Sequence, residues 1–209
     1  MSSPRVTGLT VATLGAAPAV CHHCVWWQRR GSSLRELDKR RWMERVEEGL
    51  GSFGTVYYGD DGRLVGLLQW GPAPLFPHAW ELPAGPPSDD AMLVTCAYVT
   101  DPASPWVLQS LLLAAIGEAR DRGAASIEAF AWRQAEAESA GDRFLHKTVF
   151  PLDFLGDFGF HTVRSQGRIS LARLDLGGLV AVAEGRRERV LRVVKEAFLP
   201  DPLPAPRRP

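Results

Sequence analysis

Hydrophobic positions along the chain follow two spacings, one typical of helices and one typical of strands. Two β-rich runs, "GTVYYGD" and "GRLVGLLQW", meet at Asp60-Asp61-Gly62, which accepts the positive φ of a tight turn and predicts a hairpin. "MLVTCAYVT", residues 92–100, has the continuous apolar pattern of a buried strand. Residues 34–50 predict an amphipathic helix whose apolar positions are Leu34, Leu37, Trp42, Val46 and Leu50.

The region after the buried strand predicts a crossover between two parallel strands. A helical pattern covers residues 106–122, Gly123 is positioned to end it, and "ASIEAFA" follows as a second strand. A strand, helix and strand in this order form a right-handed connection. The Pro-rich residues 71–90 are longer than a simple connection and predict a loop that faces a substrate.

The C-terminal part predicts a short helix, two strands and a long helix. "PLDFLGDFGFHTVRS" reads as a helix that stops at Gly159 and continues as a strand, and "ISLARLDL" is the last strand. We therefore expect one domain over residues 1–176 and a separate helix over 177–199. That helix either covers the sheet or pairs two subunits into a homodimer. The tail 200–209, "PDPLPAPRRP", has the composition of a disordered segment.

Composition narrows the range of partners. Lys plus Arg and Asp plus Glu both number 24, so no net charge argues for a nucleic acid as partner. No apolar run reaches the roughly 20 residues of a membrane span, and the first 15 residues lack a signal-peptide pattern, which together predict no membrane association and a cytoplasmic location. The three cysteines are expected to be thiols.

The segment "CHHCVWWQ", residues 21–28, leaves two interpretations open. Cys21 and Cys24 have the spacing of a zinc half-site, but a structural zinc needs four ligands and the chain has no second cysteine pair. The alternative is a helix-side cluster in which Trp26 and Trp27 pack, in the core or on the surface, and the thiols are reduced or form a reversible disulfide. We expect no metal.

The order of elements resembles the GCN5-related N-acetyltransferase (GNAT) fold over about residues 5–176. The stretches that carry the resemblance are "CAYVTDP", "LLLAAIGEARDRGAASIEAF" and "FLGDFGFHTVRS". "CHHCVWW", "PHAWELPAGPPSDDAMLVTCAYV" and "LARLDL" are similar to an actinobacterial branch of that family. The resemblance implies an α/β (α+β) fold with a mixed, splayed β-sheet flanked by helices, here with a C-terminal helical extension.

The resemblance also implies a site for acetyl-CoA or another acyl-CoA as cosubstrate. In that family, pantetheine pairs with a strand that corresponds to residues 94–100, which includes Tyr98, Val99 and Thr100. The pyrophosphate binds amides that open the next helix, here those of Val107, Leu108, Gln109 and Ser110. The family's loop positions for Arg or Gln, Gly, and Gly or Ala fall on Ser104, Val107 and Gln109, so this loop is degenerate. A β-branched residue at 107 crowds the approach of a phosphate.

Candidate catalytic groups are few. Glu128 is the candidate general base, because an acidic residue inside "SIEAFAW" is costly to bury without a task or a partner; the alternative is a carboxylate that faces solvent or is held by an arginine. The family's tyrosine acid corresponds to Leu155, which has no proton to donate. His78 and Glu81 in the Pro-rich loop are candidates for substrate binding.

Three functions compete. The first is an acyl-CoA-dependent N-acyltransferase, with acetyl-CoA as donor, that transfers the acyl group to an amine of a small molecule or peptide by direct attack. The second is a catalytically impaired binding or regulatory protein of the same fold, favoured by the missing loop glycine and tyrosine. The third is a biosynthetic enzyme that uses the same cleft for other chemistry.

Overall fold

The computed structural model of the chain describes residues 6–29, 39–100, 105–132 and 146–177. Within it, the residues up to Leu176 belong to one compact unit. The predicted helix over 177–199, except Gly177, and the predicted tail lie outside the described residues. So do Leu34 and Leu37, the start of the predicted amphipathic helix.

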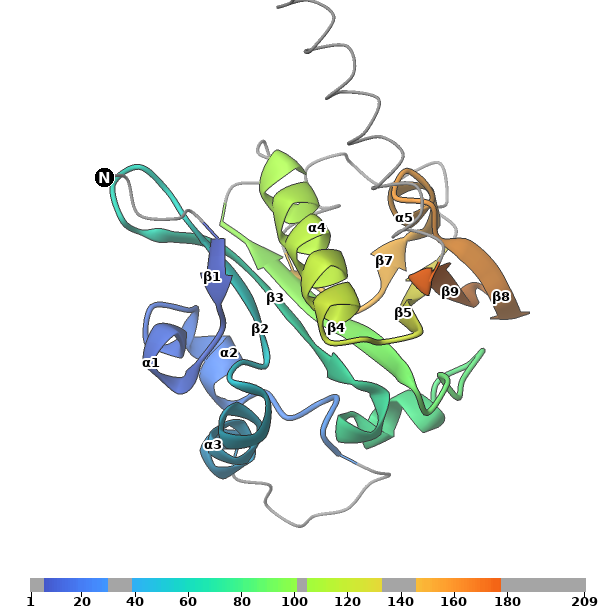
Figure 1. The fold of residues 1–209 in the computed structure, drawn as a ribbon, viewed down its shortest axis with the longest axis horizontal. Helices are drawn as coiled ribbons and strands as arrows, with labels where there is room; N and C mark the ends of the chain where they lie inside the picture. Colours follow the sequence, from blue (N-terminus) through green and yellow to red (C-terminus); the bar gives the residue numbers. More distant parts are fainter. Residues whose placement is uncertain (1–5, 30–38, 101–104, 133–145, 178–209) are drawn as a thin grey trace, which may run out of the picture. The chain divides into compact units, whose positions relative to one another are not determined.

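The strands of the described residues form one mixed sheet (Figure 1). Its main path runs β1-β2-β3-β4-β5-β9-β8, while β6 pairs with β4 and β7 pairs with β5. The pairs β4–β5 and β5–β7 are parallel, and the other pairs are antiparallel. The strands are β1 (Val6–Gly8), β2 (Gly54–Tyr58), β3 (Leu64–Pro72), β4 (Ala91–Val99), β5 (Ser126–Trp132), β6 (His146–Lys147), β7 (Phe150–Pro151), β8 (His161–Gln166) and β9 (Ile169–Asp175).

Helices surround this sheet, and α4 lies across its strands (Figure 1). They are α1 (Val11–Leu14), α2 (Ala19–His23), α3 (Lys39–Leu50), the 3-10 helices η1 (Ala73–Leu75) and η2 (Pro77–Trp80), α4 (Pro105–Asp121) and α5 (Leu152–Gly156). The expected mixed sheet with flanking helices is confirmed, and so is the predicted parallel pair of strands, which α4 connects.

Local sequence explains two of the sharpest changes of direction. Gly62 turns the β2–β3 hairpin with φ 75°, and Gly123 follows α4 with φ 74°. Residues with a Cβ avoid this left-handed region, so a glycine at each position is the low-cost choice. The hairpin and the end of the α4 helix therefore lie where the sequence predicts them.

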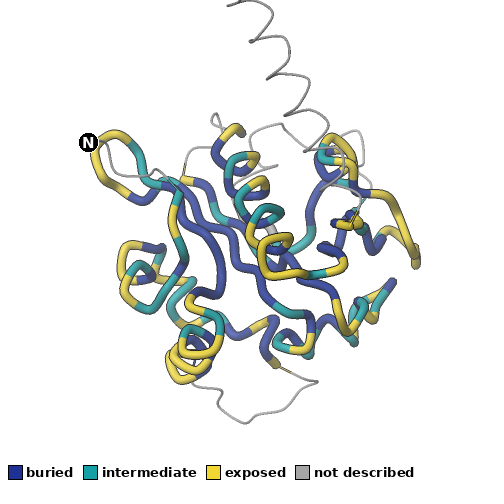
Figure 2. The backbone as a smooth tube through the Cα atoms, in the orientation of Figure 1, coloured by how far each residue is buried: buried dark blue, intermediate teal, exposed yellow. Residues whose placement is uncertain are grey.

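The two faces of the sheet pack against different elements. A Cβ added to Gly66 on β3 would lie 2.6 Å from Cγ1 of Val107 on α4, so Gly66 faces that helix. Successive strand residues point to opposite faces, which turns Leu67 away from α4. Leu67 joins a core cluster on this second face, together with Trp27, Trp42, Phe76 and Phe130. Figure 2 shows the buried central strands between exposed outer turns of the helices.

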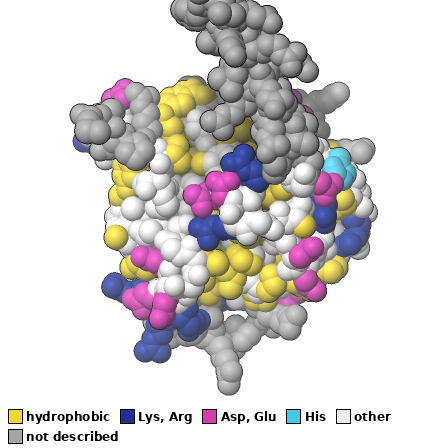
Figure 3. Space-filling view, in the orientation of Figure 1, with side chains coloured by type: hydrophobic (Ala, Val, Ile, Leu, Met, Phe, Trp, Pro, Cys, Tyr) yellow, Lys and Arg dark blue, Asp and Glu magenta, His cyan; other side chains and the backbone are white. Residues whose placement is uncertain are grey.

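Charged side chains on the face seen in Figure 3 are of both signs and are interspersed with apolar ones. Acidic and basic groups lie next to each other there, so the view shows no surface of a single sign. Within the described ranges, no helix is both long enough and apolar enough to cross a membrane.

Candidate functional site

The parallel strands β4 and β5 pair over only part of their lengths. Their pairing runs from Ala91 with Ser126 to Val94 with Ala129, although β4 continues to Val99 and β5 to Trp132. The strands part beside an irregularity in β4: Trp70 pairs with Val94 and Gln69 pairs with Cys96, which leaves Thr95 as an extra residue. Such a bulge bends a strand and increases its twist. The splayed arrangement thus begins at Thr95.

Buried hydrogen bonds hold this bulge in place. The Thr95 hydroxyl donates to the backbone oxygen of Gln69 at 3.1 Å, and Nε2 of Gln69 donates back to Oγ1 of Thr95, also at 3.1 Å. Both side chains are buried, Thr95 completely. Polar groups that pair with each other away from water fix one arrangement of the two strands, because any other arrangement would leave a buried hydrogen-bond donor without an acceptor.

Two short strands of the chain itself border the opening. β6 pairs Lys147 with Ala97 and His146 with Tyr98, while β7 pairs Phe150 with Ala131 and Pro151 with Trp132. The edge of β4 at Ala97 and Tyr98 is therefore already paired. A ligand that lines up with β4 like an added strand has to displace β6 at these positions.

The start of α4 has buried side chains but an accessible first turn. Val107 and Leu108 are buried, Gln109 is exposed, and the Ser110 hydroxyl donates to the Trp106 carbonyl at 2.9 Å. The bulk of Val107 points toward the sheet, where Gly66 leaves room for it. Trp106 is 47% exposed and packs edge to face against Tyr57, with ring centres 5.3 Å apart.

The first backbone N–H groups of an α-helix have no helical partner, and they carry the positive end of its dipole. Because the Val107 side chain turns away from the helix end, the amides of the first turn of α4 keep their capacity to bind an anion. Ser104, the remaining position of the predicted phosphate loop, lies outside the described residues.

Glu128 on β5 is held by an arginine. It is completely buried, and its Oε1 accepts from the Ser88 hydroxyl at 2.8 Å and from Nη1 of Arg173 at 3.2 Å. Its Oε2 accepts from the Ser88 backbone N–H at 2.9 Å. Both oxygens thus have donors, as expected for a buried carboxylate that ties strands and a loop together. This is the arginine-held alternative of the sequence analysis, and the role of Glu128 as a base stays a prediction.

The loop before β4 is fixed at several points. Nη1 of Arg164 on β8 donates to the carbonyls of Ala84 and Pro86, at 3.1 and 3.0 Å. The Ala84 N–H donates to Oε1 of Gln166 at 3.3 Å. With the Ser88 bonds to Glu128, these contacts attach the Pro-rich segment to the far edge of the sheet. Along this part, the segment predicted to face a substrate is a structural loop that hydrogen bonds fix to the sheet.

His78 and Glu81 pack with the N-terminal segment. Nδ1 of His78 lies 3.4 Å from Oε2 of Glu81, and the His78 ring contacts Trp26 with ring centres 4.3 Å apart. The His78 N–H donates to the Trp27 carbonyl at 3.2 Å. If His78 and Glu81 bind a substrate, as the sequence predicts, that substrate lies on the surface that η2 forms together with the segment around Trp26.

Leu155, at the position of the family's tyrosine, is a fully buried residue of α5. Its side chain packs in the interior and offers no proton.

The cysteine segment forms no metal centre among the described residues, where no group of three or more potential ligands comes together. All three cysteines are free thiols, and the ring Nε2 of His22 pairs with the Ala17 carbonyl at 2.9 Å. Burial raises the pKa of Cys21 and raises that of Cys96 to about 12. Trp27 packs in the core, which the helix-side cluster interpretation allows, while Trp26 is 38% exposed.

Sequence reasoning missed Arg173, Ser88 and Lys39. Arg173 and Glu128 are register partners across β5 and β9, and no sequence pattern gives that register. Lys39 lies one helical turn before Trp42 and Met43, on the apolar side of α3. Its phase in the helix thus indicated burial. Ser88 lies in a loop and carries no such pattern.

Comparisons with known proteins identify relatives by structure alone. No protein-family model matches the chain, and no curated protein sequence matches it significantly. The GNAT domain of PAT from S. lividans superposes with a TM-score of 0.50 at 16% identity, over 82% of this chain and 89% of that one.

Two other similar structures have lower scores. The ribosomal-protein-alanine N-acetyltransferase from Brucella melitensis is 20% identical, with a TM-score of 0.47 over 82% of this chain and 99% of that one. The protein yncA from Salmonella typhimurium, solved with its cofactor acetyl-CoA, is 16% identical, with a TM-score of 0.47 over 82% and 92%. At these identities the likeness concerns the fold. The described part of the chain has the fold of the GCN5-related N-acetyltransferases.

Proposed function

We propose that the protein is an acyl-CoA-dependent N-acyltransferase, with acetyl-CoA as the first candidate donor. The observation that carries the proposal is the divergence of β4 and β5 at the Thr95 bulge, followed in sequence by the N-terminus of α4, where the first N–H groups have no partner within the helix. The edge of a strand offers hydrogen bonds to a chain that contains amides. The N-terminus of the helix that follows it along the chain offers hydrogen bonds to a phosphate. An acyl-CoA carries both groups in this order.

In the proposed complex, the backbone of Tyr98, Val99 and Thr100 lies along the pantetheine arm. The pyrophosphate lies at the amides from Val107 to Ser110. The Val107 side chain leaves this approach free, because it packs on Gly66. For the arm to pair along β4, β6 has to leave Ala97 and Tyr98.

The reaction is a direct attack of an amine nitrogen of a small molecule or peptide on the thioester carbon. The nitrogen–carbon bond forms, the carbon–sulfur bond breaks, and the amine proton passes to a base. Glu128 already accepts three hydrogen bonds, from Ser88 and Arg173, so it can take up that proton only at the remaining acceptor site of its carboxylate or by giving up one of these donors. His78 and Glu81 would contact the acceptor. Because Leu155 has no proton to give, the thiolate leaves unaided or with a proton from the acceptor itself.

The first experiment is a calorimetric titration of the full-length protein with acetyl-CoA and with CoA. Val107→Pro removes one amide of the proposed pyrophosphate site, while Val107→Ala removes the same side chain and keeps the amide. We expect binding that is weaker for Val107→Pro than for Val107→Ala, with thermal melting to verify that both fold. Absence of heat with every acyl-CoA tested would refute the proposal.

A second candidate is a protein of this fold that binds an acyl-CoA without turnover. Two observations favour it: β6 pairs with the strand edge that a cosubstrate needs, and Leu155 replaces the usual acid. Release of free CoA in the presence of a panel of amines separates the two candidates. For the base, an identical pH–rate profile in Glu128→Gln would exclude Glu128.

A further inference from the structure

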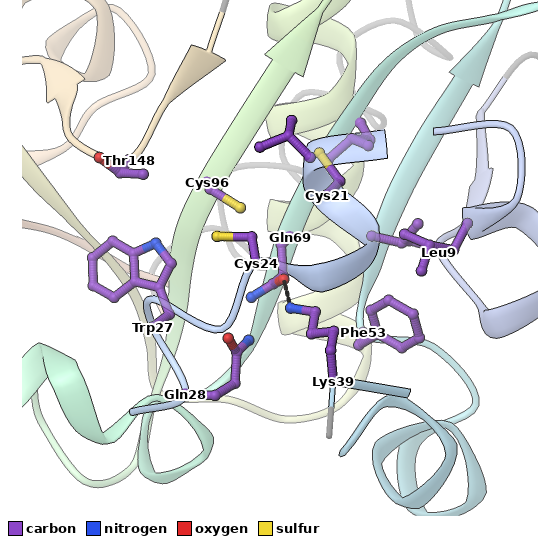
Figure 4. Close-up of a pocket in the computed structure, with 13 residues that line it drawn as sticks. Leu9, Cys21, Cys24, Trp27, Gln28, Lys39, Phe53, Gln69, Cys96 and Thr148 are labelled. Carbon is purple, nitrogen blue, oxygen red and sulfur yellow. Dashed lines mark hydrogen bonds between the residues drawn. The ribbon is translucent and has the colours of Figure 1, made fainter. Parts of the chain in front are cut away.

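A small cavity lies on the face of the sheet opposite α4, outside the proposed acyl-CoA site (Figure 4). Its volume is about 30 Å³, which is room for roughly two water molecules. Leu67 and Gln69 of β3 and Cys96 of β4 form its floor, and Cys21, Cys24 and Lys39 close it from the helical side. The polar groups that face this space have chemistry that the acyltransferase proposal does not use.

Lys39 is a buried amine, and the described residues of the cavity lining include no Asp or Glu. The residue is 7% exposed, and its Nζ donates to Oε1 of Gln69 at 3.0 Å and lies 4.8 Å from the centre of the Trp42 ring. Burial lowers the pKa of Lys39, so a larger fraction of the amine is neutral at pH 7 than for a solvated lysine. A neutral amine is a nucleophile.

Burial affects the neighbouring thiols in the opposite direction. The raised pKa values of Cys21 and Cys96 keep these thiols protonated, and the thiolate is the reactive form of cysteine. Burial therefore lowers the reactivity of the Cys21 and Cys96 thiols while it raises that of the Lys39 amine.

Two further donors in the lining have no acceptor among the described residues. They are Nε1 of Trp27 and Nε2 of Gln28, whose side chains are 2% and 6% exposed. In Figure 4 the Gln28 amide is directed toward the Lys39 side of the cavity. Buried donors in native proteins nearly always have a hydrogen-bond acceptor. We therefore expect these two groups to donate to the oxygen atoms of a bound molecule.

A wider, cationic groove adjoins the cavity. Its volume is about 730 Å³, and Lys39 lines both spaces. The other charged or titratable groups of its described lining are His22, His23, Arg29, Arg40 and Arg41, of which Arg40 pairs with Glu44 at 2.9 Å. An excess of basic groups attracts small anions and raises their local concentration. The described part of the groove thus favours a negatively charged compound near Lys39.

We propose that Lys39, which lines both the cavity and the wider groove, captures a small anionic aldehyde, an α-oxo acid of two carbons, as an imine where the two spaces meet. The Nζ lone pair attacks the aldehyde carbon, the nitrogen–carbon bond forms, and the aldehyde oxygen leaves as water with both amine protons. The carboxylate oxygens accept from Gln28 and Trp27. Gln69 Oε1 orients the amine before the attack.

The composition of the chain supports a role that needs a lysine. Of its 24 basic residues, 21 are arginines and three are lysines, namely Lys39, Lys147 and Lys195. Arginine stays charged at any pH a protein meets, whereas a buried lysine can lose its proton. The scarcity of lysines also gives a labelling experiment little background.

The test is reductive trapping of the full-length protein at pH 7. The protein is incubated with glyoxylate and cyanoborohydride, and modified peptides are quantified by mass spectrometry. We expect Lys39 to gain one carboxymethyl group several-fold faster than Lys147 and Lys195, because burial lowers the pKa of its amine. Equal labelling of the three lysines, or none at Lys39, would overturn the proposal.

Selectivity for the anion is tested with acetaldehyde, which has the same carbon count and no carboxylate. Trp27→Phe keeps the ring and removes its donor, so glyoxylate labelling should fall roughly fivefold, the equivalent of one hydrogen bond, while acetaldehyde labelling stays unchanged. If both aldehydes label Lys39 equally in the wild type, the anionic substrate class is wrong. As a second readout, glyoxylate should raise the melting temperature of the wild type but not of Lys39→Arg.

Discussion

The buried bond between Glu128 and Arg173 predicts a large loss of stability in Arg173→Met. Methionine keeps much of the arginine stem and removes the guanidinium that lies 3.2 Å from Oε1 of Glu128. The carboxylate is completely buried, so without this cation it is a buried charge stabilised only by the two bonds from Ser88. The substitution thereby separates the ion pair without opening a large cavity.

The magnitude follows from the cost of an unpaired buried charge. Removing one partner of a buried ion pair typically costs 3–5 kcal/mol. Because the Ser88 bonds remain and the Arg173 side chain is 23% exposed, we expect about 3 kcal/mol, at the lower end of that range. For a domain of this size each kcal/mol lowers the melting temperature by roughly 2–4 °C, so the expected decrease is roughly 6–12 °C.

Urea unfolding and thermal melting of the wild type and of Arg173→Met measure the loss of stability. Arg120→Met is the matched control, since Arg120 lies 2.7 Å from Asp121 in an exposed ion pair and should change stability by no more than about 0.5 kcal/mol. The double variant Arg173→Met/Glu128→Met should recover part of the loss, because it removes the isolated charge. A loss under about 1 kcal/mol in Arg173→Met, or no recovery in the double variant, would refute the assignment of Glu128 to a structural ion pair.

Three further predictions concern α4, the thiols and α5. Gly66→Ala should destabilise the fold by about 1–3 kcal/mol, because the new Cβ would lie 2.6 Å from Cγ1 of Val107, and Val107→Ala should restore part of the loss in urea unfolding. Cys96 has a raised pKa of about 12, so the folded state holds its proton above pH 9 while the unfolded state releases it. Stability should fall by up to about 1.4 kcal/mol per pH unit between pH 9 and 12, and a wild-type curve parallel to that of Cys96→Ala would contradict this. Leu155→Tyr should cost about 1–3 kcal/mol in a denaturant titration, since Leu155 is fully buried; gain of transferase activity without loss of stability would show that the site has room for the acid.

The parts of the fold with strong local signals could be predicted from the sequence. The β2–β3 hairpin depends on a turn that only a few residue types accept, and Gly62 supplies it. The crossover through α4 depends on two buried apolar strands around a helix that Gly123 ends. In each case a local pattern encodes each strand, turn or helix, so neither long-range register nor side-chain contacts were needed.

The contacts that define the site depend on register between distant segments. β6 and β7 have two residues each, too few to show a period. Ser88 and Glu128 are 40 residues apart, and Arg173 and Glu128 are 45 apart. A sequence pattern gives the face on which a side chain lies, but it does not give the partner across the sheet. The arginine that holds Glu128 therefore required the structure.

The pairing of β6 with β4 bears on whether the protein is a transferase or a binding protein, because β6 occupies the strand edge that the cosubstrate is proposed to use. A cosubstrate that needs the edge at Ala97 and Tyr98 competes with His146 and Lys147, so its apparent affinity falls by the fraction of molecules in which that edge is open. If pairing is favoured by about 1.4 kcal/mol, affinity falls about tenfold. A proline weakens strand pairing, so His146→Pro should tighten acetyl-CoA binding in a calorimetric titration. Unchanged affinity in this variant would mean that the ligand does not use that edge of β4, and the strand-like position proposed for the pantetheine arm would be wrong.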